Sequence, residues 1–410
     1  MNLDPVDLLR RLVNTPSVNP MDGLVDNSIV GESRLTALLE DVLQGLGLVV
    51  ERQRVAEGRE NLIARLDGDV LPQHGGKLIL LDAHQDTVPV AGMTIEPFNA
   101  ELRDGRVYGR GACDVKGGMA AILAAVARLV QQRPAHMPTV VVACTVNEEH
   151  GFTGALELTK LWTEKSGQII PRVPDAVIVA EPTDLNVVVA HKGVMRWKCH
   201  TKGRAAHSSR PDTGDSAIYT MAHVLEAIEH YATEIVGRRP APNLDGRDLG
   251  GRDLGPATIS VGTIQGGTSV NTVPERCTIE IDRRLLPGEE PDEARQHLID
   301  FVNRRLTDRG LRTTCVDHEP STLEGLALPD KDNGPLADRL LSAIEPTAAD
   351  RQKIGVPYAT NAAIYAVNGA PTVVFGPGSI DQAHTADEWI DVESLHQAVE
   401  IFERFVRTFS

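Results

Sequence analysis

The sequence of 410 residues has few cysteines, few aromatic residues and no concentrated run of basic residues. Its five cysteines are odd in number and lack CxxC spacing, which argues against a disulfide framework and favours reduced thiols in the interior. The formal net charge of -16 is spread along the chain, without a basic stretch that could neutralise phosphates or anionic lipids. We therefore expect neither nucleic acid nor a membrane surface as a partner.

Long apolar runs and nucleophile motifs are also missing. The N-terminal stretch MNLDPVDLLRRLVNTPSVNP has acidic residues and arginines between its apolar positions, so it predicts neither a signal peptide nor a membrane span, and we expect a cytoplasmic protein. There is no GxSxG string, and Cys113 adjoins Asp114, whose charge disfavours a thiolate. A serine or cysteine nucleophile is therefore not expected.

Short apolar runs alternate with helical patterns in the first 190 residues. KLILLDA, TVVVACTV and DAVIVA have the composition of buried strands, whereas GGMAAILAAVARLV has helical spacing. This alternation predicts an α/β fold with a central sheet between helices. In such sheets, ligands bind at the carboxyl ends of the strands.

The pattern changes near residue 190 to strand, helix, strand, strand, helix and strand. That βαββαβ order predicts a ferredoxin-like α+β domain at 190–318. It is an insertion, because the strand-like PTVVFG at 371–376 belongs with the first sheet, so one domain comprises 1–189 and 319–410. A doubled GRDLG within 238–257 predicts a surface loop.

Acidic and histidine side chains follow the predicted strands or lie in adjoining loops. Each has an ordinary alternative, such as a helix cap or a solvated turn, but together they suit a two-metal hydrolase. Two dications repel each other strongly and require a shared anionic ligand, imidazoles complete their shells, and a further carboxylate can take a proton from water. The candidates are His84, Asp114, Glu148, Glu149, Glu181 and His384.

The ordered motifs HQD, GACDVKGG, NEEHG, EPT, AHSSRP, NTVPE, GPGS and AHTADEW carry a specific resemblance. The chain resembles the dinuclear zinc amidohydrolase and peptidase family of acetylornithine deacetylase, succinyl-diaminopimelate desuccinylase, aminoacylase and glutamate carboxypeptidase. The resemblance implies a zinc-peptidase-like catalytic domain that binds two divalent metal ions, most readily Zn²⁺, with Co²⁺ able to substitute. It also implies that the insertion is a lid and dimerisation domain.

Roles for individual residues follow from the same resemblance. His84 and Glu181 would hold one metal ion, Glu149 and His384 the other, and Asp114 would bridge them. Glu148 would be the general base. Asp86 would lie behind His84 and fix its tautomer, and the peptide bond from Asp114 to Val115 would be cis.

The resemblance also assigns substrate contacts. His207 would polarise the scissile carbonyl, reaching into the site of the partner subunit in a homodimer. Asn271 and Arg284 would contact a substrate carboxylate, for which the planar guanidinium of arginine is suited. Arg283 is the neighbour most easily confused with Arg284, and strand alternation lets only one of them face the cleft.

Two glycines, Gly376 and Gly378, would let backbone amides approach the substrate; a plain turn is the alternative. We expect hydrolysis of the amide bond of an N-acyl amino acid, because AEPTDLNVVVAHKG and FGPGSIDQAHTADEW are most similar to the deacetylase and desuccinylase branch. Asn361 stands where relatives more often have an acidic residue, which puts ornithine in doubt if that position contacts a basic substrate. The alternatives are a dipeptidase or carboxypeptidase acting on short peptides, and a metal-containing binding protein without catalysis.

Overall fold

The computed structural model describes residues 3–21, 23, 26, 28–238, 254–313, 316–320 and 323–409. These residues form two compact units. Unit 1 comprises Met1–Val189, Asp330–Ile354 and Thr360–Ser410, and unit 2 comprises Ala190–Pro329 and Gly355–Ala359. Most of the loop expected at 238–257 lies outside the described residues. Among the described helices, none has both the length and the apolar character needed to cross a membrane.

Unit 1 is built on an eight-stranded mixed sheet in the order β1-β2-β6-β3-β7-β17-β8-β16. The strands from β6 to β17 run parallel to one another, whereas β1 pairs antiparallel with β2, β2 with β6 and β8 with β17. The expectation of a central mixed sheet is confirmed. The strands are β1 (Val49–Ala56), β2 (Arg59–Leu66), β3 (Leu78–His84), β6 (Thr139–Thr145), β7 (Ala176–Val179), β8 (Val187–His191), β16 (Lys353–Val356) and β17 (Thr372–Val374).

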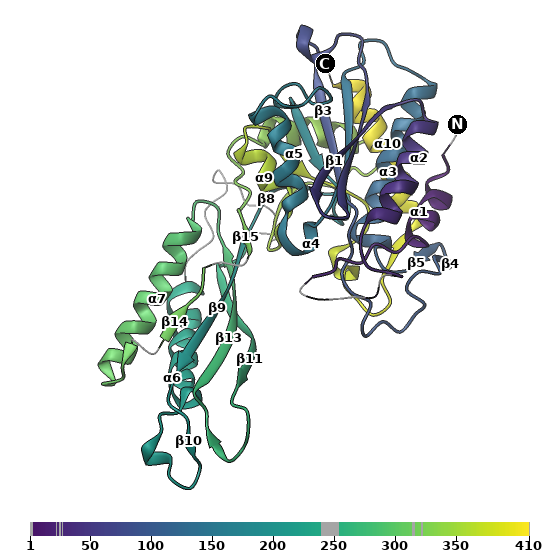
Figure 1. The fold of residues 1–410 in the computed structure, drawn as a ribbon. Helices are drawn as coiled ribbons and strands as arrows, with labels where there is room; N and C mark the ends of the chain where they lie inside the picture. The colour runs from purple at the N-terminus through teal and green to yellow at the C-terminus, as the bar shows by residue number, and fades with distance from the viewer. Residues whose placement is uncertain are drawn as a thin grey trace. The chain divides into compact units, whose positions relative to one another are not determined.

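Helices cover both faces of this sheet, as expected for buried strands. Figure 1 shows α1, α2, α3 and α10 on one side and α5 and α9 on the other, and α8 packs beside α10. Apolar side chains between these layers form the core of unit 1. The bounds are α1 (Pro5–Val13), α2 (Ser33–Gly45), α3 (Gly117–Gln131), α5 (Thr153–Thr163), α8 (Gly334–Ile344), α9 (Ala362–Val367) and α10 (Val392–Thr408). A small sheet of β4 (Glu101–Arg103), β5 (Arg106–Tyr108) and β18 (Trp389–Asp391) completes the unit.

The register of the parallel strands brings the predicted ligands to one edge. His84, the last residue of β3, pairs with Thr145, the last residue of β6. Asp82 pairs with Val179 at the end of β7. Residues that follow β6 and β7 by two to four positions therefore lie level with His84, at the carboxyl edge of the sheet where ligands are expected.

Unit 2 has the ferredoxin-like topology that the sequence predicts. Its sheet has the order β11-β13-β9-β14, with antiparallel pairing, and β15 also pairs with β9. Because β15 belongs to this sheet, the unit extends to Pro329 rather than ending at 318. The elements are β9 (Gly193–Lys202), β10 (Ala206–His207), α6 (Ala217–His230), β11 (Thr258–Gly266), β12 (Thr272–Val273), β13 (Arg276–Leu285), α7 (Pro291–Asp308), β14 (Val316–His318) and β15 (Leu323–Gly325).

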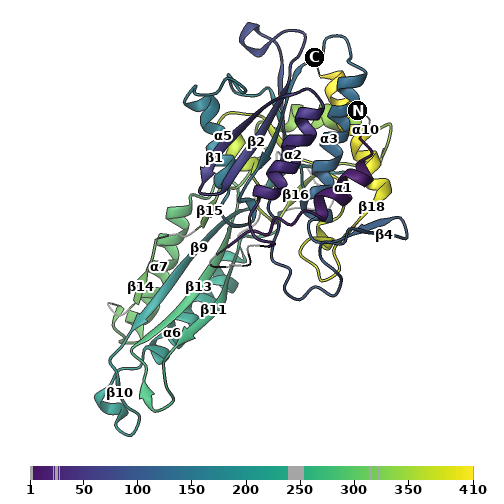
Figure 2. The same cartoon turned by 45° about the vertical axis from the view of Figure 1, so that its right-hand side comes forward.

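Alternation along the strands of unit 2 separates an apolar face from a charged one. Trp197 and Ile281 are buried in a core shared with α6 and α7, and Figure 2 shows these helices packed along β9, β13 and β11. Residues of opposite alternation, including Arg196 and Asp282, form cross-strand ion pairs on the other face. The sheet is thus covered by helices on one side only.

Candidate two-metal centre

Five of the predicted side chains come together at the carboxyl edge of the unit 1 sheet in two overlapping sets. One ligand atom from each of His84, Asp114 and Glu181 lies within 4.8 Å of the others, and the same holds for Asp114, Glu149 and His384. Nε2 of His84 lies 3.1 Å from Oδ1 of Asp114, and Nε2 of His384 lies 3.2 Å from Oδ2 of that residue. Asp114 thus offers a different oxygen to each set, which is the geometry of a bridging carboxylate.

Among these ligands, His84 ends strand β3, whereas Asp114 and His384 are presented from turns and loops. Asp114 lies in the tight turn Ala112–Lys116, immediately before α3, and its peptide bond to Val115 is cis, as expected. His384 follows a short helical turn and has a left-handed φ of 61°. A non-glycine residue keeps such a backbone conformation only where its surroundings hold it. Contacts that anchor the His384 loop therefore contribute directly to the site.

The tautomer of His84 is fixed by the backbone of Asp86 rather than by its carboxylate. Nδ1 of His84 lies 2.8 Å from the carbonyl oxygen of Asp86 but 3.9 Å from its Oδ1. Nδ1 therefore donates to the carbonyl, and Nε2 is the ring nitrogen that faces Asp114. The group of Asp86 that faces Nδ1 of His84 is thus its backbone carbonyl, and its side chain has other partners.

The carboxylate of Asp86 holds the turn that carries the two glutamates. Its Oδ1 accepts from the backbone N–H of Glu148 at 3.1 Å, and its Oδ2 accepts from that of Glu149 at 3.1 Å. Asn19 donates to Oδ2 at 2.7 Å. Because Glu148 and Glu149 open the short helix α4 (Glu148–Gly151), these bonds set the position of both carboxylates.

A second support comes from Asn147, which the sequence reasoning did not single out although it lies in the quoted NEEHG motif. Its φ of 62° is left-handed, a conformation that asparagine tolerates better than most residues. Its Oδ1 accepts from Arg59 at 2.8 Å and from Asn19 at 3.0 Å, and Arg59 in turn pairs with the fully buried Glu32. The turn before Glu148 is therefore fixed on both sides.

The site concentrates negative charge in a buried place. Burial raises the pKa of Glu148, Glu149 and Glu181, and the charge of Asp114 raises each of them further. Burial also acts to raise the pKa of Asp114, but hydrogen bonds from His384 and His84 outweigh it and lower that pKa below the usual range. Hydrogen bonds to Asp114 and Glu149 raise the pKa of His384 to about 11. The electrostatics of the site thus favour the binding of positively charged groups between its carboxylates.

The donor set fits a pair of borderline divalent cations. Each set offers one imidazole nitrogen, one carboxylate of its own and one oxygen of the shared Asp114, which are the ligand types that zinc and related ions accept. Glu148 is buried beside the sets but belongs to neither of them. It is therefore free to exchange a proton.

Two predicted substrate contacts receive a different account. The N–H of Gly376 donates to Thr183 and that of Gly378 donates to Ser394, so these amides are already used. A Cβ at Gly376 would lie 2.6 Å from the carbonyl oxygen of Glu181. This glycine permits close packing behind Glu181, which is where its importance to the site lies.

Asn361 is turned into the interior of unit 1. It is 1% exposed, and its Nδ2 donates to Asp82 at 3.0 Å and to Thr145 at 3.1 Å. Tyr365 donates to the same carboxylate. Since the amide is used in this buried cluster, Asn361 gives no reason to exclude a basic substrate.

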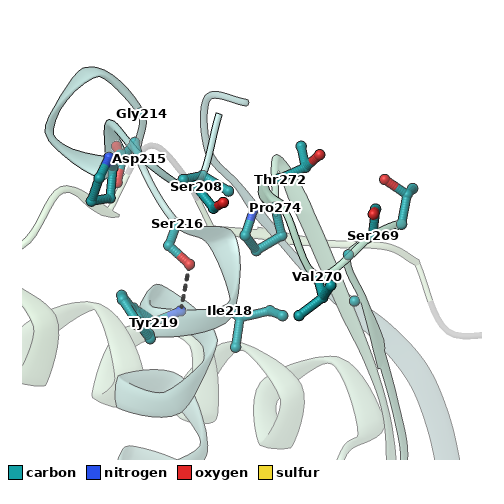
Figure 3. Close-up of a pocket in the computed structure, with 15 residues that line it drawn as sticks. Ser208, Gly214, Asp215, Ser216, Ile218, Tyr219, Ser269, Val270, Thr272 and Pro274 are labelled. Carbon is teal, nitrogen blue, oxygen red and sulfur yellow. Dashed lines mark hydrogen bonds between the residues drawn. The ribbon is translucent and has the colours of Figure 1, made fainter. Parts of the chain in front are cut away.

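His207 and Asn271 lie together in unit 2. The short strands β10 and β12 pair His207 with Thr272, which places Asn271 beside them. The backbone N–H of Ser209 donates to Nδ1 of His207, so the neutral ring carries its proton on Nε2, where it can donate to an oxygen. Next to this hairpin is a hollow of about 800 Å³, into which Figure 3 shows Ile218 and Val270 pointing.

Arg283 and Arg284 separate as alternation requires. The side chain of Arg283 is 1% exposed and pairs with Glu289, whereas that of Arg284 is 29% exposed and pairs with Asp282. Arg284 is therefore the one available to a ligand. It lies near one end of β13, and the pair of strands β10 and β12 lies beyond the other end, near Arg276. Eight residues separate Arg276 from Arg284, which at about 3.3 Å per residue is about 26 Å along the strand. A single chain thus keeps Arg284 apart from His207.

Comparison with known proteins identifies the family. Residues 80–408 match Peptidase family M20/M25/M40. The chain belongs to this family. Similar proteins include the acetylornithine deacetylase of Pectobacterium carotovorum, 32% identical over 425 residues, covering 100% of this chain and 99% of that protein. The acetylornithine deacetylase of Photorhabdus laumondii is 31% identical over 419 residues, covering 98% and 97%. As a member of the M20/M25/M40 family, the protein is a metallohydrolase that acts on amide or peptide bonds.

Solved structures share the fold at lower sequence identity. The M20 family metallo-carboxypeptidase Sso-CP2 from Sulfolobus solfataricus has a TM-score of 0.75 and 17% identity, with 98% of each chain covered. The di-peptidase Dug1p from Saccharomyces cerevisiae has a TM-score of 0.77 and 14% identity, with 98% of this chain and 95% of that chain covered. At such identities the likeness concerns the architecture, and substrate class has to be argued from the site.

Proposed function

We propose that this protein hydrolyses the amide bond of an N-acyl amino acid, with an N-acetylated basic amino acid such as acetylornithine as the first candidate substrate. The observation that carries the proposal is the pair of ligand sets that share Asp114, with the unshared Glu148 buried beside them. His84, Glu181 and Asp114 would hold one ion, and Glu149, His384 and Asp114 the other.

Each residue then has a defined task. When bound, two divalent ions supply an activated water and a Lewis acid for the carbonyl. Glu148 takes a proton from the attacking water and returns it to the leaving amine, a task that suits a carboxylate whose pKa is raised by burial and by neighbouring charges. His207 donates from Nε2 to the oxyanion. Asp86 keeps Glu148 in place through its backbone.

The choice of a deacylase over a peptidase depends on the sequence relatives. Those at 31 to 32% identity over nearly the whole chain are acetylornithine deacetylases, whereas the peptidases are related through the fold at 14 to 21% identity. The buried position of Asn361 removes the one feature that counted against a basic substrate. A dipeptidase or carboxypeptidase is the alternative within the same chemistry.

A substrate panel tests the proposal. The protein is loaded with zinc or cobalt, and free amine is measured with N-acetyl and N-succinyl amino acids and with dipeptides. We expect turnover of N-acyl amino acids, fastest with acetylornithine. Turnover of dipeptides alone would favour the peptidase alternative. If no substrate is hydrolysed although two ions are bound, the result would favour a binding protein.

We further propose a homodimer in which His207 of one subunit serves the site of the other. Within one chain, Arg284 lies about 26 Å along β13 from Arg276, and His207 lies at the far end, in the β10–β12 pair. An N-acyl amino acid spans only on the order of 10 Å. Both residues can therefore contact one substrate only if they come from different subunits. The edge strand β11 and the exposed side chains of Tyr219, Ile264 and Val270 offer a surface for pairing.

Complementation between subunits tests this arrangement. His207→Ala and Glu148→Ala chains, co-expressed with different tags, are purified as a heterodimer. If His207 acts across the interface, one of the two sites is intact and about half of the wild-type activity is expected. Activity no higher than that of the two single variants would contradict the arrangement. We also propose zinc as the native metal and a cytoplasmic location, which the buried free cysteines among the described residues support.

A further inference from the structure

Glu388 is a buried carboxylate that lies outside both ligand sets yet connects the loops that carry them. It is 0% exposed and follows His384 by four residues in the AHTADEW motif. Its Oε1 accepts from the backbone N–H of Cys113 at 2.9 Å and of Asp114 at 3.0 Å. Its Oε2 accepts from the backbone N–H of Gly111 at 3.0 Å. Three amides of the turn that carries Asp114 thus converge on one side chain.

Arg110 completes this arrangement. Its guanidinium pairs with Oε2 of Glu388 at 2.7 Å, with both side chains almost fully buried, and it also donates to the carbonyl of Thr385 at 3.4 Å. The N–H of Gly109 donates to the carbonyl of Glu388 at 2.9 Å. The loop from His384 to Glu388 is therefore fastened to the segment 109–114 at several points.

These contacts affect the two ligand sets unequally. The set of Asp114, Glu149 and His384 has two members whose backbone is held through Glu388. The set of His84, Asp114 and Glu181 has only one, because His84 ends β3 and Glu181 lies two residues after β7. In addition, His384 has a left-handed φ that its loop must maintain.

We propose that Glu388 is a positioning residue that sets the spacing between the two metal sites, and that the site containing His384 depends on it more than the site containing His84. It acts by tying the turn of the bridging Asp114 to the His384 loop. The proposal rests on the metal assignment made under the proposed function, but it concerns the relative affinity of the two sites rather than the reaction.

Titration of the full-length protein with Co²⁺ tests the proposal. Isothermal titration and visible absorption give the number of bound ions and their affinities. Wild type is expected to bind two ions per chain. Glu388→Ala is expected to weaken one site by about tenfold or more, equivalent to about 1.4 kcal/mol, and the other by no more than about threefold.

Second substitutions identify the weakened site. In a His384→Ala background, adding Glu388→Ala should change the remaining affinity little, because the dependent site is already disabled. In a His84→Ala background, it should weaken the remaining site by about tenfold. Glu388→Gln keeps one acceptor oxygen and should fall between Ala and wild type. Glu393→Ala, which removes an exposed acid of α10, is the matched control and should leave both affinities unchanged.

Each result bears on the proposal in one direction. Equal weakening of both sites, or unchanged binding in Glu388→Ala, would overturn it while leaving the proposed function intact. Should Glu388→Ala not fold, Glu388→Gln decides by the same site-selective measurement. If wild type itself does not bind two ions, the metal assignment is wrong, which is a failure distinct from that of Glu388.

Discussion

Replacing Asp86 by asparagine tests how the centre is held. Asp86 is 0% exposed and both of its oxygens accept from N–H groups, Oδ1 from Glu148 and Oδ2 from Glu149 and Asn19. In Asp86→Asn, either orientation of the amide places an NH₂ group against an N–H donor. Asn19 cannot rotate without loss, because its own Oδ1 accepts from the N–H of Met21. At least one buried donor therefore loses its partner.

The magnitude follows from that unpaired donor. A buried unsatisfied N–H costs about 1 to 3 kcal/mol, which corresponds to a loss of about 5-fold to 150-fold in the quantities that depend on Glu148 and Glu149. We expect a lower kcat and weaker Co²⁺ binding at the Glu149 site. Binding at the His84 site should change less, because His84 is oriented by the carbonyl of Asp86, which asparagine keeps.

The assay combines kcat and KM with Co²⁺ titration and a thermal melt. Asn19→Ala is the control: it removes one donor to Asp86 but leaves both backbone bonds, so its effect should be smaller. Values of kcat and Co²⁺ affinity within twofold of wild type in Asp86→Asn would refute the reasoning. Weakening confined to the His84 site would instead indicate that the carboxylate of Asp86 orients His84.

Three further predictions concern the base, the metals and pH. Glu148→Gln should lower kcat by about 10² to 10⁴, as removal of a general base does, with two ions still present by elemental analysis; loss of an ion would make Glu148 a ligand. Chelation of the metal should abolish turnover and lower Tm. Adding zinc at 100 times its Kd should then raise the free energy of unfolding by about 2.7 kcal/mol, which a refolding or melting assay measures. Burial lowers the pKa of His191 and of His318 to about 4, below the value of about 6.5 for the unfolded chain. Between these pH values the unfolded chain binds more protons than the folded one, so the stability of unit 2 should fall as pH falls from 6.5 to 4, by up to about 3 kcal/mol per histidine. The denaturant midpoint, measured over this pH range, should fall less steeply for His318→Gln than for wild type. An equally steep fall would contradict this prediction.

Much of the fold could be predicted because its periodic patterns are local. The run LILLDAH of β3 is buried throughout and lies between two other apolar strands, so its composition alone identifies it. The βαββαβ order of the insertion likewise appears in the chain order of its elements. The position at which the chain leaves the insertion was harder to predict from the sequence, because β15 is only three residues long and belongs to unit 2 only through its pairing with β9.

The candidate site divides in the same way. Its six convergent side chains lie in recognisable motifs at strand ends. The residues that hold these side chains in place are harder to predict from the sequence, because Asp86 and Glu388 accept hydrogen bonds from backbone amides of segments that are distant in sequence. Which oxygen of Asp86 accepts from which amide depends on the turn at Asn147. No spacing in the chain predicts that Arg284 and His207 lie toward opposite ends of β13.

The position of β17 between β7 and β8 has a consequence for synthesis on the ribosome. All of Ala190–Pro329 emerges before Thr372–Val374, so unit 2 has most of its residues while the central sheet still lacks an interior strand. Until then β7 and β8 have no strand between them, and unpaired strands of this kind invite association with other chains. The nascent insertion is thus able to fold first, and His384 arrives last, so the proposed metal site that contains His384 can form only in a chain that is nearly finished.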